Sequence, residues 1–435
     1  MRKRKLYIIE DIEIFKKKLL IWSKQFARLA IFDSNTISNQ NKTKFGYSNF
    51  DTIAGVGCLK EIISNENSFE NFENFSKKIN DWLFGYFSYD LKNITENLES
   101  KNFDGLKFPE LHFFQPQFVF CFSGKSIQIL FSEAINNEND IDSIFEEINK
   151  LELKDSKITS SVSIKKRISK GLYIEIIEKL KKHIKRGDIY EINFCQEFYS
   201  ENAEINPYHL FSILKNISPT PFSCFYKFDD KYLISASPER YLKKSGDKIV
   251  SQPIKGTIRR GKTIVEDKQL MEKLHSDRKE RAENIMIVDL VRNDLSRTAR
   301  KSSVEVEELC GIYSFAQVHQ MISTVVSKLH PKSSFIDVIK YSFPMGSMTG
   351  APKIRAMELI EQYEKTKRSL YSGAVGYISP ARDFDFNVVI RSFLYNKSEK
   401  YLSFQVGGAI TDKSVPENEY EECLLKAKAM IQSIK

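Results

Sequence analysis

The feature that most constrains this fold is a series of strand-like segments that follow one another, several of them with no helix between. Apolar and polar residues alternate in these segments, as in strands with one buried face: 231–237, 373–379, 386–396 and 400–410. Parallel strands need a long crossover, usually a helix, whereas antiparallel strands join through short turns. The pattern therefore favours a mixed α+β fold of mostly antiparallel sheets over a doubly wound parallel sheet.

Helical periodicity is clearest just after residue 170. Apolar residues recur at helical spacing from Tyr173 to Ile184, and Gly187 suits the end of that helix. The same pattern predicts further helices over 265–300, 352–363 and 417–434.

A polar stretch over 133–170 interrupts these patterned segments. It is predicted to hold one helix followed by a linker, which puts the domain boundary near 155–165. We therefore expect an amino-terminal region with its linker over 1–155 and a second, larger region over 165–435.

Composition and charge argue against several classes of function. The 435 residues carry a formal net charge of +9, dispersed among acidic residues, so a nucleic-acid-binding protein is not expected. Charged residues interrupt the start of the chain, which does not resemble a signal peptide, and no run approaches the roughly 18 apolar residues of a membrane span. The six cysteines lie far apart with no C-x-x-C pair, as expected for reduced thiols. We expect a soluble cytoplasmic protein with no membrane partner, in which any metal is held by oxygen.

Two helical segments each carry glutamates three residues apart: Glu280 with Glu283, and Glu419 with Glu422. This spacing puts both carboxylates of a pair on one helix face. A lone E-x-x-E pair is usually a solvated charged face, but apolar residues follow both pairs and predict burial of these helices. Buried carboxylates need a cation, and ligands that are all oxygen suit Mg²⁺.

The segment "FPMGSMTGAPKIRAMELI" runs from a glycine-rich turn into a predicted helix. Free backbone N–H groups there, with Ser347 or Thr349 nearby, make a site for an anion. The spacing does not fit a phosphate-binding P-loop, and a carboxylate ligand is equally compatible.

Three further residues are weak signals when taken alone. Arg391 lies on a mostly apolar predicted strand and calls for an anionic partner, which could equally be structural. Glu239 follows a proline at a strand end, a common place for a catalytic acid. Lys255, in "SQPIKGTIRRG", is by itself more typical of an exposed turn than of a catalytic site.

Together these stretches resemble the chorismate-utilising enzymes, which include anthranilate synthase component I, aminodeoxychorismate synthase component I, and the isochorismate and salicylate synthases. The resemblance is dense over about 168–433 and looser over 1–130, and it rests on these segments in this order: "SASPERYL", "QPIKGTIRRG", "ENIMIVDLVRNDLSR", "FPMGSMTGAPKIRAMELIE", "SGAVGYIS", "FNVVIRSF" and "VGGAITDKSVPENEYEECLLKAKAM". It implies the fold of that family, with large, mostly antiparallel sheets packed face to face and helices on the outside.

The resemblance also implies roles for individual residues. Glu239 matches the general acid that protonates the departing C4 hydroxyl of chorismate. Glu283 and Glu422 match the ligands of Mg²⁺, supported by Glu280 and Glu419. The residues expected around the substrate are Arg391, Gly346, Ser347, Thr349, Gly256, Thr257, Tyr377, Gly407, Gly408 and Gln196.

The sequence departs from the family pattern at two positions, and it matches the family at one further pocket. Gln196 replaces the lysine that activates water in isochorismate-type members, which disfavours hydroxylation at C2. Gln320 stands where the family commonly has a histidine, and His319 lies one position earlier. Asp33 and Ser34 match a region that binds tryptophan or inhibitor in relatives, a candidate regulatory pocket.

Lys255 then decides between branches of the family, because anthranilate synthases read P-I-A-G-T where this chain reads P-I-K-G-T. The resemblance implies that the lysine amine attacks C2 and that ammonia then enters at C4, giving 4-amino-4-deoxychorismate for the p-aminobenzoate and folate branch. No glutaminase-like cysteine motif is visible, so we expect ammonia from a separate glutamine amidotransferase subunit. The alternative is anthranilate synthase component I, which converts chorismate to anthranilate and pyruvate.

Overall fold

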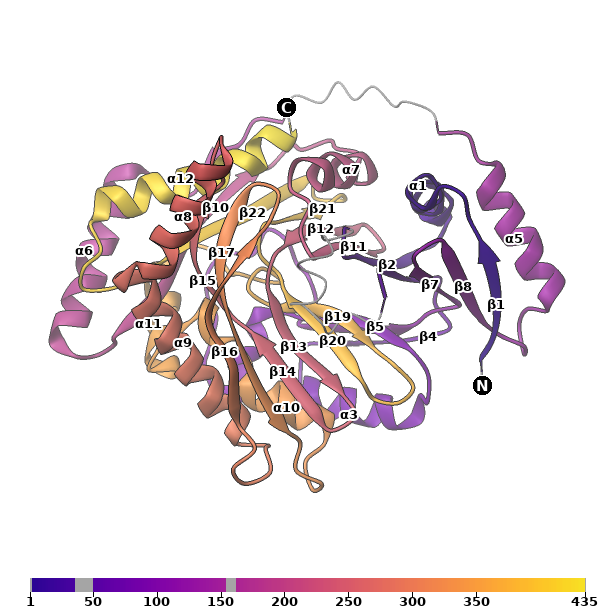
Figure 1. Ribbon diagram of the computed structural model, residues 1–435, viewed down its shortest axis with the longest axis horizontal. Helices are drawn as coiled ribbons and strands as arrows, with labels where there is room; N and C mark the ends of the chain where they lie inside the picture. Colours follow the sequence, from indigo (N-terminus) through magenta and orange to yellow (C-terminus); the bar gives the residue numbers. More distant parts are fainter. Residues whose placement is uncertain (1, 36–49, 154–161, 435) are drawn as a thin grey trace.

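The computed structural model describes residues 2–35, 50–153 and 162–434, which form two large antiparallel sheets with helices on the outside (Figure 1). This arrangement confirms the predicted α+β fold. No helix in the described ranges has the length and apolar character needed to cross a membrane.

Within the described residues, the first sheet has 12 strands. Their order across the sheet is β1 (Arg2–Ile8), β8 (Ser126–Ser132), β7 (Phe118–Ser123), β3 (Thr52–Val56), β2 (Arg28–Asp33), β11 (Phe222–Phe228), β12 (Lys231–Ser237), β21 (Ser392–Asn396), β22 (Tyr401–Ile410), β10 (Glu191–Ser200) and β18 (Gly350–Ala351), with β9 (Lys165–Lys166) paired beside β10.

The second sheet has 10 strands in the part of the chain that the structure describes. Their order is β15 (Ile254–Arg259), β17 (Val318–Lys328), β14 (Lys248–Gln252), β13 (Arg240–Ser245), β20 (Phe384–Val388), β19 (Ala374–Ile378), β5 (Leu83–Phe87), β6 (Leu111–Gln115) and β4 (Lys60–Ser64), with β16 (Glu305–Ser314) paired beside β17. Both sheets contain strands from either side of the predicted domain boundary. That boundary overlaps 154–161, which lie outside the described residues, and it stays a prediction.

The helices divide between the two sheets. Those packed on the outer face of the first sheet are α1 (Ile12–Trp22), α5 (Glu138–Lys150), α6 (Lys170–Arg186), α7 (Pro207–Ile217), α11 (Lys353–Tyr363) and α12 (Pro416–Ile434). Those packed against the second sheet are α3 (Ser68–Lys78), α8 (Ile264–Ser276), α9 (Arg278–Ser296) and α10 (Phe335–Ser342). The short helix α4 (Lys92–Glu96) lies in the connection between β5 and β6.

Local chemistry explains where the helices begin and end. The Ser169 hydroxyl accepts the Leu172 N–H at the start of α6, and Gly187 ends that helix with a positive φ of 86°. The single helix predicted over 265–300 is two helices, because the Asp277 carboxylate accepts the N–H groups of Lys279 and Glu280 and starts α9 anew.

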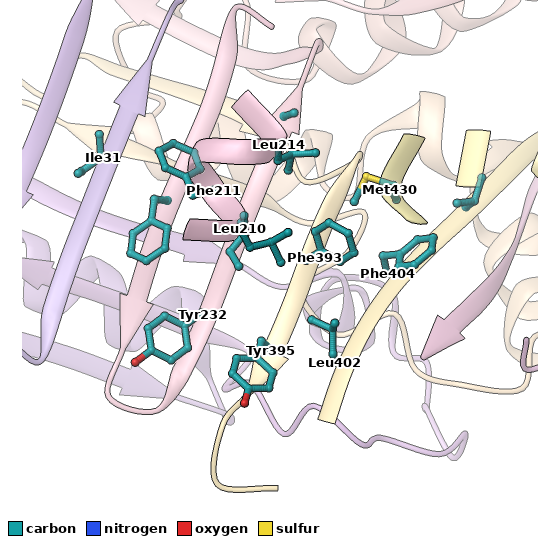
Figure 2. Packing of buried hydrophobic residues seen from close by; sticks show 14 of the residues in the cluster. Ile31, Leu210, Phe211, Leu214, Tyr232, Phe393, Tyr395, Leu402, Phe404 and Met430 are labelled. Carbon is teal, nitrogen blue, oxygen red and sulfur yellow. The ribbon is translucent and has the colours of Figure 1, made fainter. Parts of the chain in front are cut away.

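The alternation of side chains along a strand builds two cores. On β21, Phe393 and Tyr395 point into the outer core under the helices, whereas Leu394 points into the core between the sheets. Figure 2 shows part of the outer core, where Phe393 lies between Phe404 of β22 and helix α7. The ring centroids of Phe393 and Phe404 are 5.3 Å apart. Each such buried ring contributes roughly 1.5–3 kcal/mol of hydrophobic stabilisation.

Candidate active site

The candidate site lies where the chain passes twice between the sheets. Residues 238–239 lead from β12 in the first sheet to β13 in the second, and residues 389–391 lead from β20 in the second back to β21 in the first. The two crossings are hydrogen-bonded to each other, since the Val388 N–H donates to the Glu239 carbonyl over 3.0 Å and the Ala236 N–H donates to the Arg391 carbonyl over 3.0 Å. The crossings thereby place Glu239 and Arg391 at one junction.

The predicted continuous strand over 386–396 is therefore wrong, because the chain changes sheets in its middle. Arg391 is not on a strand but in the left-handed backbone region, with a φ of 52°. Its guanidinium makes no hydrogen bond or ion pair within the described ranges, and desolvation lowers its pKa. A partly exposed arginine without an internal partner is suited to an anionic ligand.

Glu239 is a buried acid held by a serine. Its side chain accepts a hydrogen bond of 2.8 Å from the Ser347 hydroxyl, and only 4% of the residue is exposed. Burial raises the pKa of Glu239 to about 7, although the serine and the nearby Lys255 act in the opposite direction. A large fraction is thus protonated at neutral pH, as a general acid requires.

The glycine turn does not run directly into a helix as predicted. Residues Gly346–Met348 form a short 3₁₀ turn, and β18 then pairs with β10 before α11 begins. The Thr349 hydroxyl donates back to the Met345 carbonyl over 3.2 Å, and Thr349 is fully buried. Of the two predicted hydroxyls, Ser347 alone therefore reaches a catalytic candidate.

Arg368 fixes this turn against the first sheet, and no sequence pattern pointed to it. Its guanidinium donates to the Met348 carbonyl over 2.6 Å and to the Asn193 carbonyl of β10 over 2.8 Å. It also forms two hydrogen bonds, of 2.7 and 3.0 Å, with the buried Glu364 carboxylate. This fully buried pair ties the Ser347 turn to β10.

Lys255 is not the exposed turn lysine that its local sequence favours. It lies on β15, its side chain is 11% exposed, and Nζ donates to Glu191 Oε1 of β10 over 2.9 Å. Burial lowers the pKa of Lys255, but the carboxylates of Glu191, Glu283 and Glu239 outweigh burial and leave the pKa raised. Lys255 and Glu239 therefore belong to one electrostatic cluster.

The two E-x-x-E pairs lie on α9 and α12, and their carboxylates interact electrostatically. Burial raises the pKa of Glu283 to about 7 and also raises that of Glu280, to which Glu422 contributes as a like charge. Lys279, whose Nζ is 3.8 Å from Glu283 Oε1, has a raised pKa because all four carboxylates outweigh its desolvation. The helices thus bring together four acidic groups around one lysine.

The second pair is less buried than predicted. The Glu422 side chain is 50% exposed and lies 2.7 Å from Lys426, and nearby lysines lower its pKa against the effect of burial. Glu419 is buried, and burial raises its pKa.

Two glycines allow the inner carboxylates to approach the sheets. A Cβ at Gly256, where φ is 95°, would lie 3.2 Å from Glu280 Oε2, and a Cβ at Gly408 would lie 3.4 Å from Glu419 Oε2. Gly407 faces the other way, against the Cys195 sulfur. Gly256 and Gly408 therefore join the site, whereas Gly407 serves packing.

The carboxylates fit a metal ion that is completed by water or substrate. Glu283 Oε1 is buried and, within the described part of the chain, has no hydrogen-bond partner. No three His, Cys, Asp or Glu side chains of that part converge closely enough to hold an ion by themselves. Mg²⁺ usually binds through one or two carboxylates together with waters or substrate oxygens, so this donor set is compatible with it.

Gln196, Tyr377 and Thr257 are not brought to this cluster. The Gln196 amide donates to the Cys423 sulfur over 3.3 Å, on the face of β10 opposite to Glu191. Thr257 is exposed on β15.

Tyr377 instead lines a cavity away from this cluster, together with Asp33 and Ser34. Asp33 is held there by ion pairs with Lys16, at 3.3 Å, and Lys215, which lower its pKa against the effect of burial. The residues around this cavity are Phe32, Asp33, Ser34, Phe50, Asp51, Ile53, Pro221, Phe222, Tyr377, Asp385 and Asn387. Its regulatory role stays a prediction.

His319 also lies outside the cluster. It is fully buried on β17, with Nε2 2.9 Å from Asp267 Oδ1 and Nδ1 2.8 Å from the Ser314 hydroxyl. Both ring nitrogens are therefore engaged by structural partners.

Comparison with known proteins identifies the family. The family model described as "chorismate binding enzyme" matches residues 23–432. The chain belongs to this family. Its relatives include the anthranilate synthase component 1 of Aquifex aeolicus, 34% identical over 81% of this chain and 74% of the relative, and the aminodeoxychorismate synthase component 1 of Bacillus subtilis, 32% identical over 80% and 76%. Relatives thus come from both branches.

Solved structures of chorismate-utilising enzymes share the fold. The anthranilate synthase component I of Streptococcus pneumoniae TIGR4 aligns with a TM-score of 0.72 and 28% identity over 80% of each chain. The menaquinone-specific isochorismate synthase of Escherichia coli aligns with a TM-score of 0.78 over 100% of this chain and 94% of its own, at 15% identity, which supports the fold alone.

Proposed function

We propose that this chorismate-binding enzyme aminates chorismate at C4 with ammonia, giving 4-amino-4-deoxychorismate. The observation that carries the proposal is the burial of Lys255 in the same cluster as Glu239 and the E-x-x-E carboxylates. A lysine amine there can act as a nucleophile, whereas the alanine of the anthranilate branch cannot.

The proposed reaction uses the two residues in sequence. The Lys255 amine attacks C2 while Glu239 donates its proton to the C4 hydroxyl, which leaves as water. Ammonia then attacks C4 and expels the lysine from C2. The raised pKa of Glu239, about 7, keeps its proton available for the first step.

Charged groups around the cluster suit a dicarboxylate substrate. Arg391, which has no internal partner in the described ranges, would bind one carboxylate of chorismate. Glu283 and Glu422 would hold Mg²⁺, with Glu280 and Glu419 supporting them. When bound, the ion would neutralise substrate carboxylate charge that the four glutamates otherwise repel.

The ammonia is proposed to come from a separate glutamine amidotransferase subunit. The proposal follows the "component 1" names of the relatives in Aquifex aeolicus and Bacillus subtilis.

The second candidate function is that of anthranilate synthase component I. It is favoured by the relative of that name, at 34% identity. Against it, both nitrogens of His319 are engaged by Asp267 and Ser314, and Gln320 cannot act as an acid or base in aromatisation.

A comparison of Lys255→Ala with the unsubstituted enzyme tests the proposal. Both are incubated with chorismate, Mg²⁺ and ammonium, and aminodeoxychorismate is detected as p-aminobenzoate after the lyase is added. We expect the unsubstituted enzyme to form this product and Lys255→Ala to lose most of the activity. Direct appearance of fluorescent anthranilate, or full activity of the variant, would refute the proposal.

A further inference from the structure

Lys255 rests in an ion pair that blocks its proposed chemistry. Its Nζ lies 2.9 Å from Glu191 Oε1, and the two side chains are 11% and 1% exposed. An ammonium group has no lone pair, so the nitrogen must lose a proton before it attacks carbon. Because the pair is so little exposed, that proton needs an acceptor within the protein.

The surrounding groups leave one acceptor within reach. The charged side chains that influence Lys255 or Glu191 come from the β12–β13 crossing and from helices α9 and α12: Glu239, Glu280, Glu283 and Glu422. Within the described residues, none of them forms a hydrogen bond or ion pair with Lys255 Nζ, whereas Glu191 does. Glu239 must itself arrive protonated to serve as the acid.

We propose that Glu191 is the general base that takes the proton from Lys255 Nζ as this nitrogen attacks C2, and that it returns the proton when the lysine leaves. This inference rests on the proposed covalent function. It gives a catalytic role to a residue that the sequence motifs did not single out.

The protons balance over the cycle. In the first half, Lys255 gives one proton to Glu191, and Glu239 gives one to the departing C4 hydroxyl, so that water leaves. In the second half, the incoming ammonia bonds to C4 and gives a proton to Glu239, while the C2–nitrogen bond breaks and Glu191 reprotonates the freed amine. Chorismate and ammonia thus become aminodeoxychorismate and water, and all three residues return to their starting states.

The position of Glu191 suits this task. Its backbone is fixed in the sheet, since Glu191 pairs with Ala351 of the neighbouring strand β18. Its second oxygen, Oε2, is buried and has no hydrogen-bond partner in the described part of the chain. That oxygen can carry the transferred proton while Oε1 keeps its contact with Nζ.

The test follows formation of the covalent adduct with ammonia left out. Enzyme, Mg²⁺ and chorismate are mixed, and intact-mass spectrometry measures the rate at which Lys255 gains chorismate less water, from about pH 6.5 to 9. In the unsubstituted enzyme we expect a rate that falls as pH rises above about 7, where Glu239 loses the proton that it must donate; Lys255 adds no rise, because its proton moves within the pair. In Glu191→Gln the amide still accepts a hydrogen bond but takes no proton, so we expect at least a tenfold loss at pH 7. The fraction of free amine then rises about tenfold per pH unit and offsets the loss of the Glu239 proton, so the rate should no longer fall above pH 7.

Two further variants distinguish a general base at position 191 from a residue that only holds Lys255 in place. Glu191→Asp keeps a carboxylate, so we expect a slower reaction with the fall above pH 7 restored. Glu197→Gln removes a buried carboxylate on the same strand that binds Arg167 and Tyr401, so we expect reduced thermal stability but an unchanged pH profile. A rate that falls above pH 7 in Glu191→Gln as it does in the unsubstituted enzyme would overturn the base role, whereas absence of any adduct in the unsubstituted enzyme would refute the covalent function beneath it.

Discussion

Replacement of Ser347 by alanine is expected to make the acid Glu239 work at higher pH. The Ser347 hydroxyl donates a hydrogen bond of 2.8 Å to the Glu239 carboxylate and so stabilises its ionised form. Removing the donor should raise the pKa of Glu239, because the ionised carboxylate loses one of its two stabilising hydrogen bonds. The hydrogen bond from the backbone N–H of Ile254 remains.

The size of the shift follows from the strength of that hydrogen bond. A hydrogen bond to a charged group contributes about 1.5 kcal/mol or more, and one pKa unit corresponds to about 1.4 kcal/mol. The pKa of Glu239, about 7, should therefore rise by about 1 unit in Ser347→Ala. Since the protonated acid is the active form, activity falls as pH rises through this pKa. At pH 8 the variant should keep about half of its own maximal activity, against about a tenth for the unsubstituted enzyme.

The assay is the pH dependence of kcat/KM for amination, which reports the free enzyme, at saturating Mg²⁺ and ammonia. Each profile is expressed relative to its own maximum, so that a change in substrate affinity does not affect the comparison. Thr349→Val is the matched control, because it removes a buried hydroxyl that bonds only to carbonyls of the same turn. If kcat/KM of Ser347→Ala falls at the same pH as in the unsubstituted enzyme, or at a lower pH, this description of Glu239 is refuted.

Three other substitutions probe the cluster. Gly256→Ala forces a side chain into a left-handed backbone position 3.2 Å from Glu280 Oε2, and calorimetry should show a loss of about 1–2 kcal/mol of stability together with weaker Mg²⁺ binding. Glu283→Gln should weaken Mg²⁺ binding at least tenfold in isothermal titration, and chelation of Mg²⁺ should abolish amination by the unsubstituted enzyme. Arg368→Met leaves the Glu364 carboxylate buried without its cation, so urea unfolding should show a loss of about 3–5 kcal/mol.

Each of these three predictions would be contradicted by a specific result. Unchanged Mg²⁺ affinity in Glu283→Gln would remove this residue from the proposed metal site. Normal stability of Gly256→Ala would mean that β15 relaxes without cost, and a loss below about 1 kcal/mol in Arg368→Met would show that the Ser347 turn is held by other contacts.

The sequence predicted local structure better than the meeting of distant segments. Alternation identified the strands and their antiparallel class, because it depends only on which side chains are buried. It could not show that residues 389–391 cross between sheets, since apolar residues continue through the crossing. The Asp277 cap could have been read from the sequence, because an aspartate three residues before Glu280 is a helix-start signal.

The site shows the same division. Lys255 and the E-x-x-E pairs lie on elements whose partner face is fixed by packing, and Glu239 lies in the short crossing between β12 and β13, so the structure brings them into one cluster. Gln196 lies five positions after Glu191 on β10, and an odd offset on a strand puts the two side chains on opposite faces. Alternation could therefore have separated them, but only the three-dimensional pairing shows that Glu191 faces Lys255.

The order of strands in the second sheet explains why Tyr377 lies away from the cluster. Its strand, β19, is separated from β15 by β17, β14, β13 and β20, an order that no local pattern reveals.

The position of the new carbon–nitrogen bond tests the central claim most directly. The enzyme is supplied with chorismate, Mg²⁺ and isotopically labelled ammonium, and the product is examined by NMR for coupling between the labelled nitrogen and ring carbons. The account predicts nitrogen on C4 of a product that keeps its enolpyruvyl ether, with little of it formed by Lys255→Ala. Nitrogen on C2 with release of pyruvate would contradict it.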